Sequence, residues 1–547
     1  MELNFAALHE EIAGLIPDRP CLVWRDRQWT WAETTERTRR FANLLTAMGL
    51  GRKGSLESCT RWQSPHDHIA LYATNGNVYL EAMIGSAKAG AAAVNVNYRY
   101  GPEELAYVLN DCRAAAVVYQ RCFTPTLEAA LPLLERPPAL ICVDDGTDHV
   151  LLDEAVDYEA SLAGSSAERP SVEWSGDDLY VLYTGGTTGN PKGVLWRQAD
   201  FLVAALGLRP GAGDDTADRE MIERRTKGAR LAALPAPPFM HGAAHWNALS
   251  CWLNGGTVVI QDRTDRFDPA DIADTAERHR VTSLLIVGDA FARPLVDELS
   301  QRRRDLSALR HVLTGGAILS PAVQADLLSL LPEIRIVDVL GSSETGRQAV
   351  ADTSGTSPDG AGRFRASATT AVVNEDHTRI LDPTDTTVGW LAQGGRVPRG
   401  YLDDPDKTRQ TFPQIEGTTW AVSGDRARRR NDGTIELLGR ESVTINSGGE
   451  KIFAEDVEQV LKAHPAVFDV LVVGRPSDRW GQEVTAVVAL RPGRDVSLED
   501  LRATAEPHLA RYKLPRGLAV VDQIERSPSG KPDYAWARAV VSDLSDP

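Results

Sequence analysis

Short apolar segments alternate with helix-like stretches along most of this 547-residue chain. Residues 68–72, 139–143, 179–183 and 311–314 are rich in Val, Ile, Leu, Ala and Tyr, which is typical of buried strands. Residues 31–50 instead carry apolar side chains at helical spacing. The alternation predicts an α/β fold with layers built on mostly parallel sheets. Further strands are expected at 91–96, 115–119, 257–261 and 283–287, and a helix at 76–90.

The length exceeds what one hydrophobic core needs, so at least two domains are expected. The best boundary lies at Gly439–Arg440, because a compact α+β pattern follows it. We predict a large, multi-lobed N-terminal domain over 1–439 and a small, mobile α+β domain over 440–547. Within the small domain, helices are expected at 454–463 and 498–509, and strands at 467–473 and 483–490.

Two segments lack a clear period. Residues 55–67 are interpreted as a surface loop whose role the sequence leaves open. Residues 211–228 are charged and interrupted by glycine, and are predicted to form a mobile loop.

Composition excludes several classes of protein. The formal net charge is -17, from 59 Lys and Arg against 76 Asp and Glu, which disfavours a nucleic-acid or anionic-membrane surface but permits a local basic pocket. No uninterrupted apolar run reaches membrane-spanning length, and the first residues, MELNFAALHEE, resemble no secretory signal. The six cysteines form no CxxC pair. We therefore expect a cytoplasmic protein with reduced thiols and no stable membrane insertion, and leave a homodimer open.

The strongest chemical signal is the segment YTGGTTGNPKGV over residues 183–194. An apolar strand runs into a loop of Gly and Thr that ends near Lys192. Glycines let successive backbone N–H groups turn toward phosphate oxygens, and lysine adds a point positive charge. The spacing is not GxxxxGK[ST], so a P-loop kinase fold is disfavoured.

This loop resembles the phosphate-binding signature of the adenylate-forming superfamily, which includes acyl-CoA synthetases, peptide-synthetase adenylation domains and luciferases. The resemblance extends along nearly the whole chain and is nearest to CoA ligases for steroid side chains and other bulky polycyclic acids. It implies ATP, Mg²⁺ and coenzyme A as cofactors. On the phosphate side it implies contacts from Thr184, Gly185, Gly186, Thr187, Thr188, Gly189 and Lys192.

The segment LGSSETG over residues 340–346 resembles the family's Tyr-Gly-x-Thr-Glu sequence. The resemblance implies that Glu344 holds Mg²⁺ together with Thr184, and a hard carboxylate oxygen suits that ion. The sequence departs from the family at Leu340, where many relatives carry an aromatic residue against adenine, and at Ser343. The nucleotide side of this segment is implied to comprise Asp338, Leu340, Gly341, Ser342 and Ser343.

Three further segments resemble nucleotide-binding motifs. Gly315, Gly316 and Ala317 follow a strand and are small enough for close approach to a flat base, although an ordinary turn explains them equally well. Asp425 is implied to accept hydrogen bonds from the ribose hydroxyls. Arg440 is implied to contact phosphate or ribose oxygens at the hinge, where flexion is expected over 440–442.

The C-terminal part carries two more motifs. RSPSGKPD, over residues 526–533, resembles the loop whose lysine assists adenylation, which is Lys531 here. Its ammonium would stabilise negative charge that develops at the α-phosphate. NSGGEK, over residues 446–451, resembles the region that lines the pantetheine route; a simple hairpin turn is the alternative. The residues implied there are Ser447, Gly448 and Gly449.

PAPPFMHG, over residues 235–242, resembles the segment that ends at the acyl pocket. His241 is implied to border the carboxylate and gate the thiol; a backbone-bonded core histidine is the alternative. A general base is not needed, because the attacking carboxylate is already charged. Lys531, Lys192, His241, Thr184 and Glu344 are thus the implied catalytic set. The substrate pocket is predicted to contain His241, Gly242, Ala243, His245, Val287, Gly288 and Asp289.

The predicted reaction is ATP-dependent formation of an acyl-adenylate, followed by transfer of the acyl group to CoA. Small residues in the pocket segments favour a bulky polycyclic acid of steroid or diterpenoid type. A medium- or long-chain fatty acid is the first alternative, and an adenylation enzyme that loads a carrier protein is the second. A non-catalytic nucleotide-binding homologue and a luciferase-type oxygenase also stay open.

Overall fold

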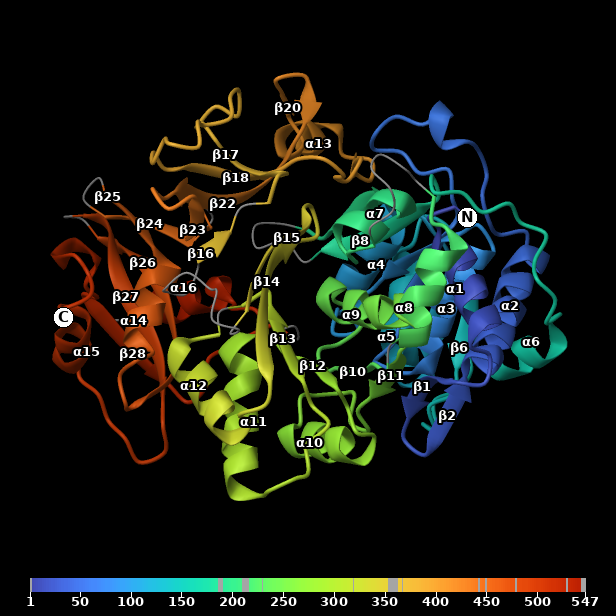
Figure 1. The fold of residues 1–547 in the computed structure, drawn as a ribbon, viewed down its shortest axis with the longest axis horizontal. Coiled ribbons are helices and arrows are strands. Elements are labelled where there is room, and N and C mark those ends of the chain that lie inside the picture. The colour runs from blue at the N-terminus through green and yellow to red at the C-terminus, as the bar shows by residue number, and fades with distance from the viewer. Residues whose placement is uncertain are drawn as a thin grey trace.

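A computed structural model places residues 2–184, 190–208, 216–228, 230–317, 319–352, 363–365, 367–440, 443–447, 450–477, 480–527 and 530–542. The amino-terminal half lies at one end of the molecule and the carboxy-terminal strands lie at the other (Figure 1). Two large sheets flanked by helices make up the amino-terminal half and the middle of the molecule, so the expected α/β layers are confirmed.

The first large sheet has eight strands, in the order β15-β14-β13-β12-β10-β11-β1-β2. Its six inner strands pair in parallel, and an antiparallel strand closes each edge. The strands are β1 (Pro20–Trp24), β2 (Arg27–Thr30), β10 (Ala232–Pro235), β11 (Thr257–Ile260), β12 (Ser283–Leu285), β13 (His311–Gly315), β14 (Arg335–Ser342) and β15 (Gly346–Asp352).

The second large sheet also has eight strands, in the order β19-β9-β8-β4-β3-β5-β6-β7. Strands β8 to β7 pair in parallel, and β9 and β19 add an antiparallel edge. The strands are β3 (His68–Tyr72), β4 (Ala92–Asn95), β5 (Ala114–Gln120), β6 (Ala139–Val143), β7 (Val156–Asp157), β8 (Leu179–Thr184), β9 (Lys192–Arg197) and β19 (Gly400–Tyr401).

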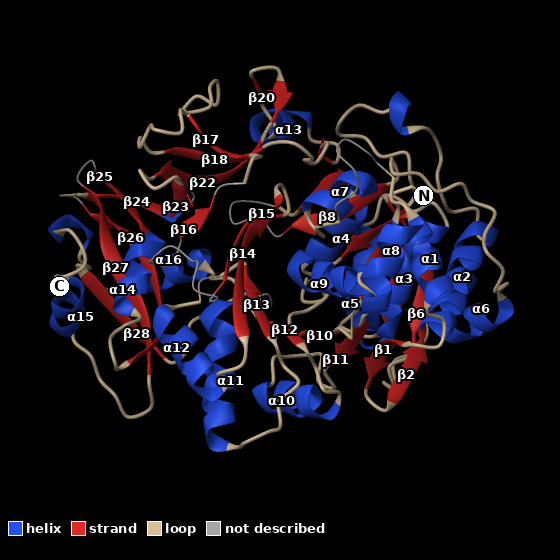
Figure 2. Cartoon of the chain, in the orientation of Figure 1, coloured by secondary structure: helices blue, strands red, loops and turns tan. Residues whose placement is uncertain are grey.

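Helices flank both large sheets (Figure 2). Their starts carry recognisable signals: α2 begins with a capping box between Thr30 and Glu33, and α10 begins with Asp268 as N-cap and Pro269 in the first turn. The helices of this part are α1 (Phe5–Leu15), α2 (Trp31–Ala47), α3 (Asn77–Lys88), α4 (Pro102–Asp111), α5 (Thr124–Ala130), α6 (Tyr158–Gly164), α7 (Gln198–Ala204), α8 (Arg219–Gly228), α9 (Gly242–Leu253), α10 (Pro269–Arg278), α11 (Gly288–Gln301) and α12 (Pro321–Leu330).

The prediction of a mobile loop over 211–228 is wrong for residues 219–228, which form α8. The charges lie on the exposed face of this helix, while Ile222 and Thr226 are buried and α1 and α9 pack beside it. Tertiary packing therefore stabilises a segment whose composition alone indicates a loop.

A five-stranded antiparallel sheet, in the order β16-β23-β22-β18-β17, follows the two large sheets and was not predicted. A two-stranded hairpin and one short helix lie close to it (Figure 1). These elements are β16 (Arg363–Arg365), β17 (Thr370–Val373), β18 (Gly389–Gln393), β22 (Ala421–Arg429), β23 (Thr434–Arg440), β20 (Gln414–Ile415), β21 (Thr418–Thr419) and α13 (Pro405–Thr411).

The last hundred residues have a hydrophobic core of their own, formed by buried side chains between Val443 and Val541. The predicted helices and strands are present there, although the second helix ends at Ala505 and is shorter than expected. The elements are β24 (Thr444–Ser447), β25 (Glu450–Phe453), α14 (Ala454–Leu461), β26 (Val467–Ser477), β27 (Gly481–Leu490), α15 (Leu498–Ala505), β28 (Gly517–Val521) and α16 (Tyr534–Ser542).

No helix in the described part of the chain is both long enough and apolar enough to span a membrane.

Candidate active site

The phosphate loop joins two antiparallel strands at the edge of the second large sheet. Thr184 ends β8, Lys192 begins β9, and the two residues lie opposite each other in the ladder. The Lys192 ammonium forms an ion pair with the carboxylate of Asp404. The loop residues Gly185, Gly186, Thr187, Thr188 and Gly189 lie outside the described residues.

Glu344 lies in the turn between β14 and β15, at the edge of the first large sheet. The turn is held locally, because the backbone N–H of Glu344 donates to Ser342 Oγ at 3.2 Å. It is also tied to the second sheet, because the indole of Trp196 in β9 donates to the carbonyl of Ser343 at 2.9 Å. The hydroxyl of Tyr401 donates to Glu344 Oε1 at 2.9 Å. The half-buried carboxylate therefore lies where the two sheets meet.

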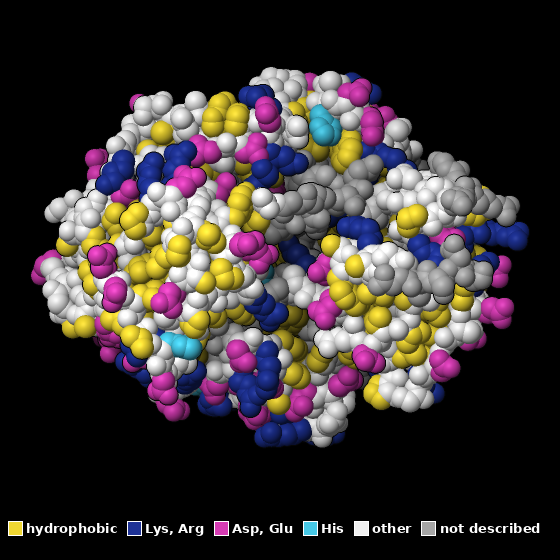
Figure 3. Space-filling model, turned by 180° about the vertical axis from the view of Figure 1, so that it is seen from behind, with side chains coloured by type: hydrophobic (Ala, Val, Ile, Leu, Met, Phe, Trp, Pro, Cys, Tyr) yellow, Lys and Arg dark blue, Asp and Glu magenta, His cyan; other side chains and the backbone are white. Residues whose placement is uncertain are grey.

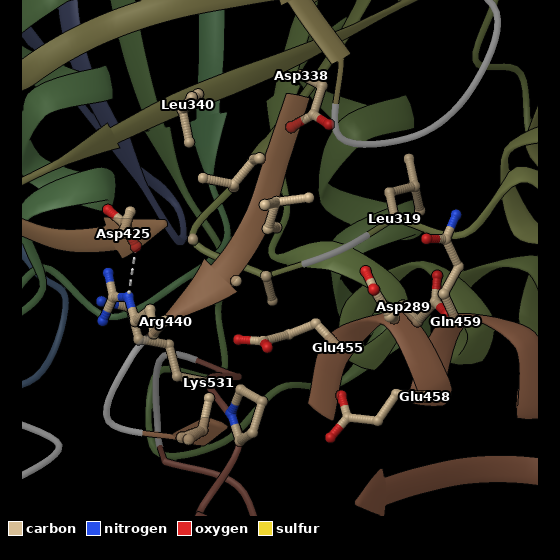
Figure 4. Close-up of a pocket in the computed structure, with 18 of the residues that line it drawn as sticks. Asp289, Leu319, Asp338, Leu340, Asp425, Arg440, Glu455, Glu458, Gln459 and Lys531 are labelled. Carbon is tan, nitrogen blue, oxygen red and sulfur yellow. Dashed lines mark hydrogen bonds and ion pairs between the residues drawn. The ribbon is translucent and has the colours of Figure 1, made fainter. Parts of the chain in front are cut away.

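A cavity of about 330 Å³ lies between the first large sheet, the five-stranded sheet and the carboxy-terminal elements. Asp338 and Leu340 of β14 line one wall, and Asp425 and Arg440 line another (Figure 4). Burial raises the pKa of Asp338 to about 6. From behind, the molecule is hollowed near the middle of its face, with basic and acidic side chains at the rim (Figure 3). Other predicted residues that line the cavity are Gly316, Ala317, Gly341 and Lys531.

Two of the predicted glycines are required by close backbone approach. A Cβ on Gly315 would lie 2.8 Å from the carbonyl oxygen of Val339 in the neighbouring strand. A Cβ on Gly341 would lie 2.2 Å from the carbonyl oxygen of Gly346 across the hairpin. Both positions therefore exclude larger residues for reasons of packing, independently of any ligand.

Asp425 and Arg440 are cross-strand partners on β22 and β23. Arg440 Nε donates to Asp425 Oδ1 at 3.1 Å, and Ser423 Oγ donates to Asp425 Oδ2 at 3.0 Å. The negative charge of Asp425 is the main cause of the raised pKa of Arg440, and burial opposes it. Sequence motifs fifteen residues apart thus form one charged unit on the cavity wall.

Lys531 reaches the cavity from the carboxy-terminal part (Figure 4). Its loop closes on itself, because Ser527 N donates to the Lys531 carbonyl at 2.8 Å. Gly530 has φ +76°, and a Cβ there would lie 3.0 Å from Phe291 in α11. A Cβ on Gly316 would lie 3.5 Å from Lys531 Cε, so the side chain extends over the predicted adenine loop. Although Lys531 is exposed to the cavity, the surrounding protein lowers its pKa, and Arg440 adds to this effect.

His241 and His245 have different environments. The His245 ring is fully buried, and its nitrogens bond to the Phe239 carbonyl, at 2.7 Å, and to the Tyr180 hydroxyl. His245 therefore supports α9 from within the protein and does not face a substrate. His241 is the N-cap of α9, and its buried Nε2 has no hydrogen-bond partner among the described residues. Burial, followed by the charge of Lys531, lowers the pKa of His241 to about 3, so the ring is neutral at pH 7.

The other predicted pocket residues lie at the starts of α9 and α11. Gly242 and Ala243 begin α9 and are partly exposed. Val287 is the N-cap of α11, and the N–H of Gly288 donates to Thr314 Oγ1 at 3.0 Å. Asp289 lines the 330 Å³ cavity and contacts protein groups there. Its Oδ1 accepts from Ser320 N at 2.7 Å, and its Oδ2 lies 3.6 Å from Lys462 Nζ in the carboxy-terminal part.

Strands β24 and β25 pair antiparallel, with Ser447 opposite Glu450. Ser447 is buried and also pairs with Gly481 of β27. Gly448 and Gly449, and the expected flexion residues 441–442, lie outside the described residues.

Sequence reasoning missed Tyr401, Asp404, Glu455 and Lys462 near the site. Asp404 carries the only local signal, since Asp followed by Pro405 marks a helix start. Glu455 lines the cavity, and burial, reinforced by Glu458, raises its pKa to about 8. The described part of the chain contains no group of three or more His, Cys, Asp or Glu side chains arranged to hold a metal ion.

Comparison with known sequences identifies the class of protein that this fold and site define. The chain belongs to the AMP-binding enzyme family: the family's sequence model matches residues 10–402, and the model of the AMP-binding enzyme C-terminal domain matches residues 456–531.

Two curated relatives extend over almost the whole chain. The medium-chain acyl-CoA ligase Mig of Mycobacterium avium is 46% identical over 535 residues, covering 97% of each protein. The 3-oxocholest-4-en-26-oate–CoA ligase of Rhodococcus rhodochrous is 38% identical over 548 residues, covering 98% of this chain and 96% of the relative. The chain is accordingly an acyl-CoA ligase, an acid–thiol ligase that uses a carboxylic acid, ATP and CoA.

Solved structures share the fold at low sequence identity. The anthranilate CoA ligase AuaEII, solved with anthranoyl-AMP, superposes with a TM-score of 0.83 at 19% identity, covering 100% of this chain and 99% of that one. ATP-bound MatB from Rhodopseudomonas palustris superposes with a TM-score of 0.79 at 21% identity, covering 99% of each chain. The adenylate-forming fold, with its small C-terminal part, is thereby confirmed.

Proposed function

We propose that this ligase forms an acyl-adenylate in the 330 Å³ cavity and then transfers the acyl group to CoA. The observation that carries the proposal is the position of Lys531, which extends over Gly316 in the cavity that Asp425 and Arg440 also line. Charges from the sheets and from the carboxy-terminal part thus converge on one space of nucleotide size.

Each charged group has a distinct role in this proposal. Asp425 accepts hydrogen bonds from the ribose hydroxyls, and Arg440 contacts ribose or phosphate oxygen. Lys531 stabilises the charge that develops as the acid's carboxylate attacks the α-phosphorus and pyrophosphate leaves. Lys192 and the 184–189 loop hold the departing phosphates. Leu340 gives adenine an aliphatic contact on one side.

Glu344 fits the role of a Mg²⁺ ligand. Its carboxylate supplies hard oxygen atoms. Among the described residues, Tyr401 donates a hydrogen bond to Oε1 of this carboxylate. Mg²⁺ commonly binds one or two carboxylates and takes its other ligands from phosphate and water, so a single Glu, with Thr184 as the second proposed ligand, suits an ATP-bound ion. The ion would neutralise charge on the phosphates during the first half-reaction.

The second half-reaction requires the carboxy-terminal part to move. We propose a boundary at 439/440, with the 440–547 domain rotating about residues 440–442 to withdraw Lys531 and admit the thiol. Its separate hydrophobic core supports movement as one body. The hairpin at Ser447, Gly448 and Gly449 would then line the pantetheine route, and neutral His241 would border the acyl carbonyl.

The proposed acid is hydrophobic, and a medium-chain fatty acid is the first candidate because the 46%-identical relative is named for medium-chain acids. A bulky polycyclic acid is the second candidate, because two relatives at 38% identity are named for a steroid acid, one of them together with medium- and long-chain fatty acids. Small residues at Gly242, Ala243 and Gly288 suit either class.

Product analysis by mass spectrometry tests this proposal. The protein is incubated with ATP, MgCl₂ and straight-chain, aromatic, steroid or diterpenoid acids, with and without CoA. We expect acyl-AMP without CoA, its conversion to acyl-CoA with CoA, and the largest yield for a medium-chain acid. An adenylate that free CoA never consumes would instead indicate a carrier-protein acceptor. A larger yield from a steroid acid would select the second candidate.

A further inference from the structure

A short segment, residues 399–404, connects the phosphate lysine to the proposed metal carboxylate. We call it the strap. Its centre is β19, which adds an antiparallel strand to β9 beside the phosphate loop. Backbone N–H groups of Arg399 and Leu402 donate to Leu195 and Gly193 of β9, each at 2.8 Å. The strap is therefore fixed in register with Lys192, the first residue of β9.

Tyr401 holds one end of this connection. Its side chain is 5% exposed and packs on Phe412, with ring centroids 5.6 Å apart. The hydroxyl emerges at Glu344 and donates to Oε1 at 2.9 Å. A hydrogen bond to a charged acceptor is stronger than a neutral one and fixes the rotamer of the carboxylate. The other carboxylate oxygen stays available for a ligand.

Asp404 holds the other end and uses its two oxygens differently. Oδ1 accepts the backbone N–H of Lys407 at 2.8 Å, which makes Asp404 the N-cap of α13. Oδ2 pairs with the ammonium of Lys192. Lysine has four rotatable bonds and a side chain that is 38% exposed here, so this capped carboxylate limits where the ammonium can go.

The strap is itself braced from outside by the irregular 55–67 loop. Arg61 Nε donates to the Arg399 carbonyl at 2.8 Å, and the N–H of Asp403 donates to the Trp62 carbonyl at 2.8 Å. Arg399 returns hydrogen bonds to the carbonyls of Cys59 and Thr60, each at 3.2 Å. This docking gives the loop a structural purpose that its sequence does not indicate.

We propose that Tyr401 and Asp404 are positioning residues for adenylation, setting the separation and orientation of Glu344 and Lys192 around the ATP phosphates. The inference rests on the proposed roles of Glu344 and Lys192. Phosphoryl-group chemistry depends mainly on placement and electrostatics, so a small displacement of either charge lowers the rate. One six-residue segment would thereby fix the position of the β8–β9 hairpin relative to the β14–β15 hairpin on the other sheet.

The test uses two isosteric variants and one matched control. Tyr401→Phe removes only the hydroxyl and keeps the packing on Phe412. Asp404→Asn removes the charge that holds Lys192, yet retains an N-cap, since Asn and Asp cap helices equally well. The control is Asp406→Asn on the same helix, where the side chain is 82% exposed and pairs with Arg409. All three are compared in ATP–pyrophosphate exchange with decanoate, and ATP–Mg²⁺ binding is measured by calorimetry without acid.

We expect kcat for exchange to fall about tenfold in each test variant, the lower end of what losing a hydrogen bond to a charged group costs. Tyr401→Phe should also raise the Mg²⁺ concentration at half-maximal rate. Asp404→Asn should leave KM for ATP unchanged or lower, because Lys192 loses a competing anion. Asp406→Asn should match the parent. If both test variants keep kcat within twofold of the parent, the inference is overturned.

A double-mutant cycle separates positioning from general structural support. Tyr401→Phe should have little further effect in a Glu344→Gln background, because the hydroxyl acts through that carboxylate. Additive losses would overturn positioning through Glu344. The cycle also distinguishes failure of the proposed function from failure of this inference. If Glu344→Gln alone leaves the ATP–pyrophosphate exchange rate unchanged, the proposed role of Glu344 is refuted. If Glu344→Gln lowers the exchange rate but Tyr401→Phe does not, only the positioning role of the strap is refuted.

Discussion

The two sides of the proposed nucleotide site are built in different ways. On the phosphate side, Lys192 and Glu344 belong to the two large sheets and are held by Asp404 and Tyr401 of the strap. On the nucleoside side, Asp425 and Arg440 pair at the predicted boundary, and Lys531 enters on a loop of the carboxy-terminal part. The first pair of charges is held in place by the strap, whereas under the proposed domain rotation Lys531 of the second group would be withdrawn.

Removal of the Lys531 ammonium should produce the largest difference between the rates of the two half-reactions. We expect Lys531→Ala to lower ATP–pyrophosphate exchange by about 10²- to 10³-fold, the usual loss when one preorganised charge at a transition state is removed. Transfer from supplied acyl-AMP to CoA should stay close to the parent rate. Arg494→Ala, an exposed substitution in the same part of the chain, is the control. Unchanged exchange would contradict the role of Lys531.

Removal of the fixed charge should act through the metal. We expect Glu344→Ala to raise the Mg²⁺ concentration at half-maximal exchange by about tenfold, because one hard oxygen ligand is lost. A MgCl₂ titration at saturating ATP measures this shift, with exposed Glu333→Ala as the control. A superimposable titration would argue against Glu344 as a ligand.

The contact between α11 and the carboxy-terminal part should have a smaller effect on the half-reactions, in the opposite direction. Asp289 is 3% exposed, and its Oδ2 lies 3.6 Å from Lys462 Nζ in the carboxy-terminal part and 3.6 Å from Arg293 Nη2 on its own helix. We expect the pair with Lys462 to favour the arrangement in which Lys531 is inserted. We expect Asp289→Asn to change the ratio of adenylation to thioester formation by about fivefold in favour of the thioester step, a modest coupling energy. Separate rates for the half-reactions measure it. An equal change in both rates would show that the pair does not discriminate between the arrangements.

Glu455 provides the smallest expected effect, on stability. Burial, and then Glu458, raise its pKa to about 8, so the folded protein binds a proton that the unfolded chain releases above its ordinary pKa of 4.5. Stability therefore falls as pH rises from about 4.5 to 8. Glu455→Gln stays neutral and escapes this penalty. We expect its Tm to exceed that of the parent by about 2 °C at pH 8.5, with a smaller difference at pH 5.

Calorimetric scans across this pH range measure the effect, with the exposed Glu499→Gln as the control. A Tm difference that does not vary with pH would mean that Glu455 is ionised in the folded protein.

Local patterns predicted most of the parallel strands, because a buried parallel strand is a short apolar run bounded by turns. Strands β3 and β6 begin and end where the sequence predicts. The antiparallel sheet of β16, β17, β18, β22 and β23 was missed, since β16, β17 and β18 have only 3, 4 and 5 residues and β22 carries the charges of Arg426, Arg428 and Arg429. Helix α8 was missed because its stability comes from packing.

For the site, motif resemblance predicted residues for contact with ATP but gave no indication of the side chains that hold Glu344 and Lys192 in the structure. Tyr401 lies 57 residues from Glu344, and Asp404 lies 212 residues from Lys192. Contacts at such separations leave no periodic signal in the sequence. Asp289 and His245 illustrate the opposite case. Their positions within motifs predicted contact with the substrate, whereas in the structure both side chains form hydrogen bonds with other protein groups.

The two hairpins proposed to hold the phosphates and Mg²⁺, β8–β9 and β14–β15, belong to the antiparallel margins of otherwise parallel sheets. In a parallel interior, each strand is committed by a crossover helix, and an inserted residue shifts the alternation of a whole face. At a hairpin tip, an insertion or deletion is absorbed by the turn, and the ladder behind it keeps its register. Sequence changes in the two loops proposed to bind nucleotide can therefore arise without disturbing the core, and these two turns are natural points for grafting segments between relatives.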